Sequence, residues 1–314
     1  MQIGFAVPLS GSWATPDNQV RLARRAEELG YSSLWTFQRL LFPADRDGPD
    51  AARWQPVYRS VHDPLITLAF LAAQTTRIRL GVAVLNMPFF SPILLAKQTA
   101  TLDAVSGGRL DLGLGLGWSR EEYAAAGAPF DRRGARAEEF LACLKALWTE
   151  DLVDFHGSFH EITRAHVEPK PVQRPHPPLL LGGSAEPALR RAGRVADGWI
   201  SSSGQDLGSI GSAIRVVADA AAGAGRDPAT LRYVCRGVVR LRDEATGERR
   251  PLTGSLEQIR ADCAVLAEQG VTEMFVDLNF DSDIGVVDAD PAASMARAEE
   301  LLVALAPAGP TLVR

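Results

Sequence analysis

Short apolar segments alternate with helical segments along almost the whole chain, and this alternation limits the possible folds more than any other feature. Most of these segments have no polar face, which is typical of strands in a parallel sheet covered by helices. They occupy residues 3–7, 33–36, 78–87, 110–118, 179–181, 199–200, 231–241 and 273–278. Eight repeats within 314 residues predict an α/β fold, a TIM-type (β/α)8 barrel, rather than an open doubly wound sheet. We expect one domain over residues 1–314.

One segment, residues 151–178, interrupts the alternation. It begins with VDFHGSFHEI, which predicts a hairpin turning at His156-Gly157, and it continues with the proline-rich KPVQRPHPP. Because it leads directly into the apolar strand at residues 179–181, we expect an excursion from the barrel and not a linker between domains.

The segment at residues 110–118 has an unusual composition for a strand. Leucines at positions 112, 114 and 116 alternate with glycines at 113, 115 and 117. Alternate side chains of a strand point to opposite faces, so one face would be leucine and the other bare. A bare face indicates either the close approach of a flat ligand or a crowded neighbour inside the barrel. The residues alone leave both interpretations open.

The active site of a TIM-type barrel lies at the carboxyl ends of its strands. There, Gly182-Gly183-Ser184 precedes a predicted helix, so free backbone N–H groups and the positive end of the helix dipole favour a phosphate. The alternative is a glycine turn in which Ser184 caps its own helix. Tyr123 could add a hydroxyl to the same anion, or it could be a core residue. No Gly-x-Gly-x-x-Gly follows the first strand, so a Rossmann dinucleotide site is not indicated.

Composition excludes several other classes of function. The net charge of −5 and the short, dispersed basic clusters give no support for nucleic acid as a partner. No apolar stretch is long enough to suggest a membrane span, and the N-terminal residues do not resemble a secretory signal. The three cysteines lack the spacing of metal ligands, and His156 and His160 have no third ligand nearby. We therefore expect no metal and a cytoplasmic protein with reduced thiols.

Several stretches resemble the bacterial luciferase-like monooxygenase family, in the order in which the family has them. They are LAKQTATLDAVSGGRLDLGLGLGW, RRGARAEEFLACLKALW, EPKPVQRPHPPLLLGGS and ADGWI. The resemblance extends from about residue 15 to 280 and is closest to the branch described as F420-dependent. It implies a barrel that binds FMN or the deazaflavin coenzyme F420.

The resemblance also implies roles for individual residues. Family members have a non-proline cis peptide in the third strand, under the cofactor ring, and here it would fall at Ala83-Val84. Asn86, Gly115, Gly117 and Trp118 would then lie near the ring. The phosphate-binding turn of the family matches Gly182, Gly183, Ser184 and Ala185, and Tyr123 matches a tyrosine that contacts the phosphate in several FMN-dependent members.

Two departures from the family pattern bear on catalysis. Several F420-dependent members carry a histidine at the end of the second strand, where this chain has Gln38 and Arg39. An arginine cannot act as a general base, but it could hold a substrate anion or stabilise negative charge during hydride transfer; the alternative is a salt bridge across the barrel mouth. Trp118 replaces a glutamate of the sugar-phosphate-oxidising members, which argues against that substrate class and favours an apolar or aromatic substrate.

These observations predict an oxidoreductase that transfers a hydride between F420 and a small organic substrate, with Arg39 and Gln38 as catalytic candidates. Three alternatives stay open: an FMN-dependent monooxygenase that activates oxygen, a non-catalytic flavin-binding protein, and a barrel enzyme for a phosphorylated metabolite. The resemblance further implies a homodimer formed by the helices that follow the second and third strands.

Overall fold

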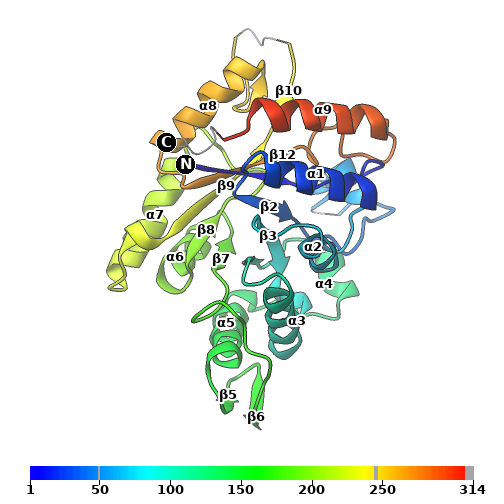
Figure 1. The fold of residues 1–314 in the computed structure, drawn as a ribbon. Helices are drawn as coiled ribbons and strands as arrows, with labels where there is room; N and C mark the ends of the chain where they lie inside the picture. The colour runs from blue at the N-terminus through cyan, green and yellow to red at the C-terminus, as the bar shows by residue number, and fades with distance from the viewer. Residues whose placement is uncertain (49, 244–246, 308–314) are drawn as a thin grey trace, which may run out of the picture.

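The predicted barrel is confirmed in a computed structural model, which describes residues 1–48, 50–243 and 247–307. Eight parallel strands close in the order β1-β12-β9-β8-β7-β4-β3-β2 (Figure 1). The barrel strands are β1 (Gln2–Ala6), β2 (Ser33–Thr36), β3 (Arg79–Asn86), β4 (Leu110–Gly115), β7 (Leu179–Gly182), β8 (Gly198–Ile200), β9 (Arg232–Val238) and β12 (Glu273–Asp277).

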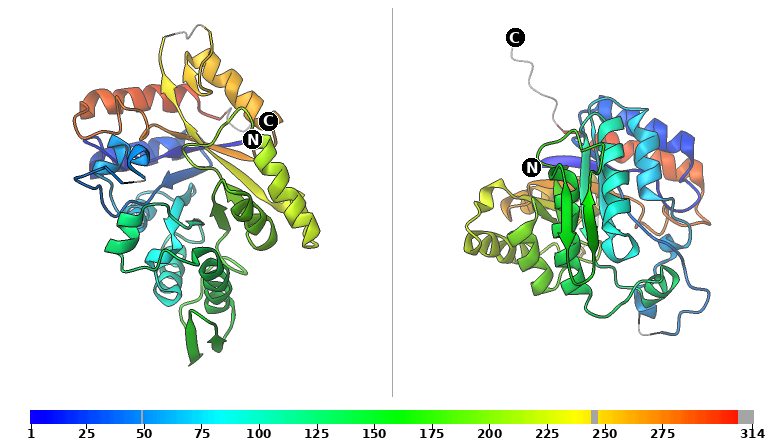
Figure 2. Two further views of the ribbon diagram at one scale, coloured as in Figure 1. Left: turned by 180° about the vertical axis from the view of Figure 1, so that it is seen from behind. Right: turned by 90° about the horizontal axis from the view of Figure 1, so that it is seen from below.

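Helices surround this barrel on its outer side (Figures 1 and 2). They are α1 (Pro16–Glu28), α2 (Pro64–Ala72), α3 (Pro92–Val105), α4 (Arg120–Ala125), α5 (Arg133–Thr149), α6 (Glu186–Val195), α7 (Ile210–Gly223), α8 (Leu256–Glu268) and α9 (Pro291–Ala304), with short 3-10 turns η1 (Ala51–Arg53), η2 (Pro56–Arg59), η3 (Met87–Phe89) and η4 (Pro228–Thr230). Four of the long helices begin as the sequence indicates, with a capping side chain followed by proline. The caps are Thr15, Asp63, Ser91 and Asp290. In the described part of the chain, no helix has the length and apolar character needed to cross a membrane.

Two small sheets lie outside the barrel. The expected hairpin is formed by β5 (Val153–His156) and β6 (Glu161–Ala165), which project beyond α5 at the bottom of Figure 1. The strand expected at residues 231–241 is divided, because the chain changes its pairing partner. Val238 still pairs with β12, whereas β10 (Arg240–Leu241) pairs with β11 (Thr253–Gly254).

The glycine-rich strand does not line an open groove. A methyl group on Gly113 would lie 2.1 Å from the Val82 carbonyl oxygen, and one on Gly115 would lie 2.7 Å from Cγ2 of Val84. Gly117 lies beyond the end of β4 in a turn with φ of +72°. At Gly113 and Gly115 the structure supports the crowded neighbour, since β3 fills the space beside β4, whereas a ligand near Gly117 stays a prediction.

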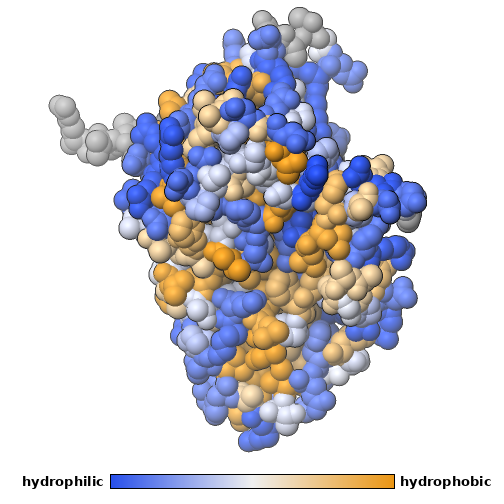
Figure 3. Space-filling view, turned by 90° about the vertical axis from the view of Figure 1, so that its right-hand side faces the viewer, coloured by the Kyte–Doolittle hydropathy of each residue, from blue (hydrophilic) through white to orange (hydrophobic). Residues whose placement is uncertain are grey.

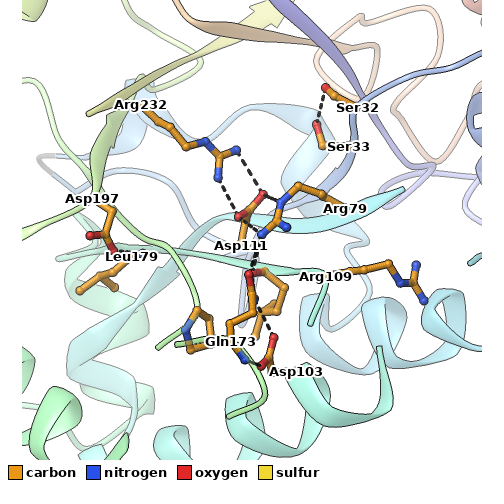
Figure 4. A network of polar contacts seen from close by, with 12 residues as sticks. Ser32, Ser33, Arg79, Asp103, Arg109, Asp111, Gln173, Leu179, Asp197 and Arg232 are labelled. Atoms are coloured by element: carbon orange, nitrogen blue, oxygen red, sulfur yellow. Dashed lines mark hydrogen bonds and ion pairs between the residues drawn. The ribbon is translucent and has the colours of Figure 1, made fainter. Parts of the chain in front are cut away.

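A charged network closes the amino-terminal end of the barrel (Figure 4). The guanidinium groups of Arg79 and Arg232 converge on the fully buried carboxylate of Asp111, at 2.6 and 2.7 Å from Oδ1. Arg232 also binds Glu273 at 2.7 Å. Gln173, from the proline-rich return, accepts from Arg79 and donates to the carbonyl of Leu110. The excursion thus seals the end of the barrel opposite the candidate active site.

Candidate active site

The site expected at the carboxyl ends of the strands is organised around Val84. The Ala83-Val84 peptide is cis, as expected, and the β3–β4 register shifts between Val82 and Leu85. The Val84 side chain lies against Gly113, Gly115 and Gly182, where any Cβ would come within 3.3 Å of it. These glycines are needed because Val84 occupies the space that their side chains would fill.

Asn86 lies at the end of β3 and is almost fully buried. Its backbone N–H donates to Oε1 of Gln38 at 2.9 Å, so Gln38 connects the ends of β2 and β3. A Cβ on Gly117 would come within 3.2 Å of the Asn86 side chain. The structure therefore brings Gln38, Val84, Asn86, Gly115 and Gly117 together.

The β7–α6 turn has the properties of an anion site. Ala185 is the N-cap of α6, and no side chain caps this helix, so the alternative in which Ser184 caps its own helix is wrong. Within residues 1–48, 50–243 and 247–307, no acceptor takes the N–H groups of Ser184 or Ala185. Free N–H groups at a helix start are a ready site for a phosphate. Gly183 has φ of +139°, and its carbonyl accepts from the indole of Trp199 at 2.8 Å.

Tyr123 is buried, with its ring against Phe89 and Phe130. Its hydroxyl donates to the Leu116 carbonyl oxygen at 2.5 Å. Burial raises the pKa of the Tyr123 hydroxyl to about 12. A phosphate oxygen would have to displace Leu116 to receive this proton, so the core interpretation accounts for the contacts of Tyr123, and its role toward a phosphate stays a prediction.

Arg39 forms the salt bridge that the sequence left open as the alternative to a catalytic role. Its Nη1 lies 2.8 Å from Oε2 of Glu122, whose side chain is fully buried. The same carboxylate accepts from the Leu40 N–H at 2.7 Å. The guanidinium also lies over the rings of Tyr58 and Trp118, at 4.4 and 4.7 Å from their centroids. Arg39 thus holds an aromatic wall at the mouth of the barrel, while its part in catalysis stays untested.

Trp118 belongs to that wall. Its ring contacts Trp54 at 4.8 Å and Tyr58 at 6.4 Å, and Tyr58 contacts Phe280 at 5.7 Å, each measured between ring centroids. The wall is therefore built from residues 54–58 of the long segment after β2, from the end of β4 and from the end of β12. It gives the mouth of the barrel a largely aromatic lining.

Arg236 on β9 was not among the residues expected in the site, and its side chain is buried among the strand ends. Its Nε lies 3.5 Å from Oδ2 of Asp277, and neither of these atoms has a hydrogen-bond partner among the described residues. Its Nη2 donates to the carbonyl of Ala83. Burial lowers the pKa of Arg236 and raises the pKa of Asp277. Two orphaned polar atoms in a charged pair beside the cis peptide indicate a functional position.

The alternation of side chains along the strands accounts for the position of this pair once the inward faces are known. Along β9, Val234 lies in the cluster of side chains that fills the barrel. Arg232 and Arg236 lie two residues before and after it, so their side chains point to the same, inner face of the strand. On β12, Asp277 lies two residues after Phe275, which belongs to the same cluster, so the Asp277 side chain also points inward. In the described part of the chain, no three His, Cys, Asp or Glu side chains lie close enough together to hold a metal.

Comparison with known proteins identifies the family. The sequence matches the profile of the luciferase-like monooxygenases over residues 3–261. The chain belongs to this family. A Mycobacterium tuberculosis protein known only as uncharacterized is 33% identical over 291 residues, which cover 90% of this chain and 92% of that protein.

Family members with stated activities differ in their cofactor. The FMNH2-dependent dimethylsulfone monooxygenase of Pseudomonas putida is 35% identical over 63% of this chain and 52% of its own length. The F420-dependent glucose-6-phosphate dehydrogenase of Amycolatopsis mediterranei is 33% identical over 61% of this chain and 55% of its own. Among solved structures, the monooxygenase RslO1 of Streptomyces bottropensis has the same fold, with a TM-score of 0.78, 22% identity and 98% coverage of both chains. This luciferase-like protein is thus a member of an oxidoreductase family with F420-dependent and FMN-dependent members.

Proposed function

We propose that this luciferase-like protein binds coenzyme F420 at the mouth of the barrel and transfers a hydride between it and a small apolar or aromatic substrate. The observation that carries the proposal is the β7–α6 turn, with its free N–H groups beside Gly182 and Val84. The family membership and the F420-dependent relative support this assignment.

The residues present fit a phosphate-bearing flavin-type cofactor. Gly182, Gly183, Ser184 and Ala185 would hold the phosphate through backbone N–H groups and the Ser184 hydroxyl, and a contact of Tyr123 with the same phosphate stays a prediction. The carboxylate of Glu186 in the first turn is paired with Arg190 at 2.6 Å, so its charge is partly neutralised. Ala83, Val84, Asn86, Gly117 and Trp118 would line the space for the ring, and Gly115 would leave room for the Val84 side chain behind it.

When bound, the deazaflavin supplies the hydride chemistry, and the protein supplies orientation and electrostatics. The buried guanidinium of Arg236 would stabilise negative charge that develops next to Ala83 during transfer. Asp277, which faces it, would keep that guanidinium in place. Gln38 would fix the position of Asn86, and Arg39 would hold the aromatic wall that keeps water away from the substrate.

An FMN-dependent monooxygenase is the second candidate, favoured by the 35% identity to the dimethylsulfone enzyme. Oxygen dependence separates the two. With reduced F420 and a panel of apolar and aromatic carbonyl compounds, oxidised F420 should form at the same rate in air and under argon, because hydride transfer needs no oxygen. A reaction that requires reduced FMN and consumes oxygen would contradict the proposal, and cofactor retention without any turnover would favour a non-catalytic flavin-binding protein.

We also propose that the protein forms a homodimer through α2 and α3. These helices expose large apolar side chains, including Ile66 (73% exposed), Leu94 (62%) and Val105 (61%). Exposed apolar residues on two neighbouring helices favour an interface. Figure 3 shows one side of the molecule, on which hydrophobic residues gather in the middle and lower parts.

The cytoplasmic location of the protein stays a prediction.

A further inference from the structure

A cavity lies outside the proposed cofactor site, between the segment that follows β2 and the segment that follows β12. It has two parts, of about 390 and 250 Å³, which share Phe42, Arg46 and Arg59 as lining residues. The second part is also lined by Trp54, Val286 and Asp288. The larger part alone has the size of a small-molecule site. Because β2 and β12 lead into these segments, the cavity lies at the same end of the barrel as the proposed active site.

The cavity carries an excess of positive charge. Neither Arg46 nor Arg59 has an acidic partner within 4.0 Å in the part of the chain that the structure describes. Arg46 instead lies over the ring of Phe42, at 4.8 Å from its centroid. Asp288 is the acidic residue of the lining. A guanidinium without an acidic partner is suited to binding the two oxygens of a carboxylate or sulfonate.

The apolar wall of the cavity is continuous with the aromatic wall of the barrel mouth. Trp54 lines the cavity and is 7% exposed. Its ring contacts Phe42 at 5.9 Å and Trp118 at 4.8 Å. Its indole Nε1 is buried without an acceptor among the described residues. The exposed edge of the Trp54 ring and the half-buried Phe42 give the cavity an apolar side against which a flat apolar body can pack.

We propose that this cavity binds the anionic group of the substrate, so that the enzyme acts on organic acids in which a carboxylate or sulfonate is attached to a flat apolar or aromatic body. Arg46 and Arg59 bind the anion, and Phe42 and Trp54 contact the body. Trp54, which contacts Trp118 at 4.8 Å between ring centroids, connects this cavity to the aromatic wall of the barrel mouth. This assignment of substrate class rests on the proposed function.

The cofactor-free protein tests the cavity directly. It is titrated by calorimetry with naphthalene-2-carboxylate and with its neutral analogue naphthalene-2-carboxamide. We expect the carboxylate to bind at least about tenfold more tightly, because charge-assisted hydrogen bonds are about twice as strong as neutral ones. The preference should weaken with added salt, because both arginines are exposed.

Variants locate the binding site. The double variant Arg46→Gln, Arg59→Gln should bring the two affinities to within about twofold of each other. Arg215→Gln, which removes the same charge from the exposed face of α7, should keep the preference of the wild type. Equal binding of acid and amide by the wild type, or a preference that survives in the double variant, would overturn the proposal.

The titration with the acid and the amide can fail while F420 still binds, and it can succeed while F420 does not bind, so the two proposals are tested separately. Discrimination between acid and amide without any affinity for F420 would retain the anion cavity and reject the F420 reaction. F420 binding without that discrimination would retain the reaction and reject the substrate class.

Discussion

Replacing Asp111 with asparagine should lower the free energy of unfolding by about 3 kcal/mol, because it leaves two arginines without their shared carboxylate. Asp111 is fully buried, whereas the side chains of Arg79 and Arg232 are 32% and 26% exposed. Their partial access to water places the expected loss at the lower end of the range for broken buried ion pairs. Urea denaturation of the wild type and the variant measures the difference.

The loss should depend on pH in a defined direction. Burial alone would raise the pKa of Asp111, but the hydrogen bond from Arg79 and the charge of Arg232 outweigh burial and lower it. A lowered pKa contributes stability above the unfolded-state value of about 3.9, and that stability is lost as the pH falls through the folded-state value. The stability difference between wild type and Asp111→Asn should therefore be constant near neutral pH and shrink below about pH 4.

Asp219→Asn is the matched control. Asp219 is exposed on α7 and forms no ion pair with any described residue, so its replacement should change the stability by less than about 0.5 kcal/mol. An Asp111→Asn variant as stable as this control at neutral pH would contradict the account of the barrel's closed end.

Replacing Gly183 with alanine should weaken cofactor binding by about 10- to 100-fold. The backbone of Gly183 has φ of +139°, which side-chain-bearing residues rarely adopt, and an added Cβ would lie 2.7 Å from Cβ of Ala188. The turn must then shift at the place where its N–H groups would receive the phosphate. Strain of this kind costs on the order of 1–3 kcal/mol, which corresponds to the stated change in affinity.

Gly223→Ala provides the comparison for Gly183→Ala. Gly223 lies at the end of α7 with no atom within 4 Å of an added Cβ, so this variant should keep full affinity. Calorimetric titration of both variants with F420 measures the effect. Equal affinity of the two variants for F420 would show that the β7–α6 turn does not bind the cofactor.

The sequence predicts the elements of this fold well because the signals for them are local. Thr15, Asp63, Ser91 and Asp290 each mark a helix start through a cap and an adjacent proline, and the barrel follows from the repetition of apolar strands. The resemblance to the family located the Ala83-Val84 cis peptide, which no local pattern indicates.

Contacts between distant segments were beyond the reach of the sequence. Arg39 meets Glu122 across 83 residues, and Asp111 meets Arg232 across 121. Nothing near Arg39 distinguishes a buried salt bridge from a free guanidinium, because its partner comes from another strand end. The glycines of β4 gave two interpretations for the same reason, since the side chain that fills their space is Val84 of the neighbouring strand.

The most direct test of the proposed function is a paired calorimetric titration of the purified, cofactor-free protein with F420 and with FMN. We expect micromolar or tighter binding of F420, much weaker binding of FMN, and a loss of F420 affinity in Ser184→Ala. The reverse preference would place the protein with the FMN-dependent members of the family, and binding of neither cofactor would contradict the assignment of the barrel mouth as a flavin site.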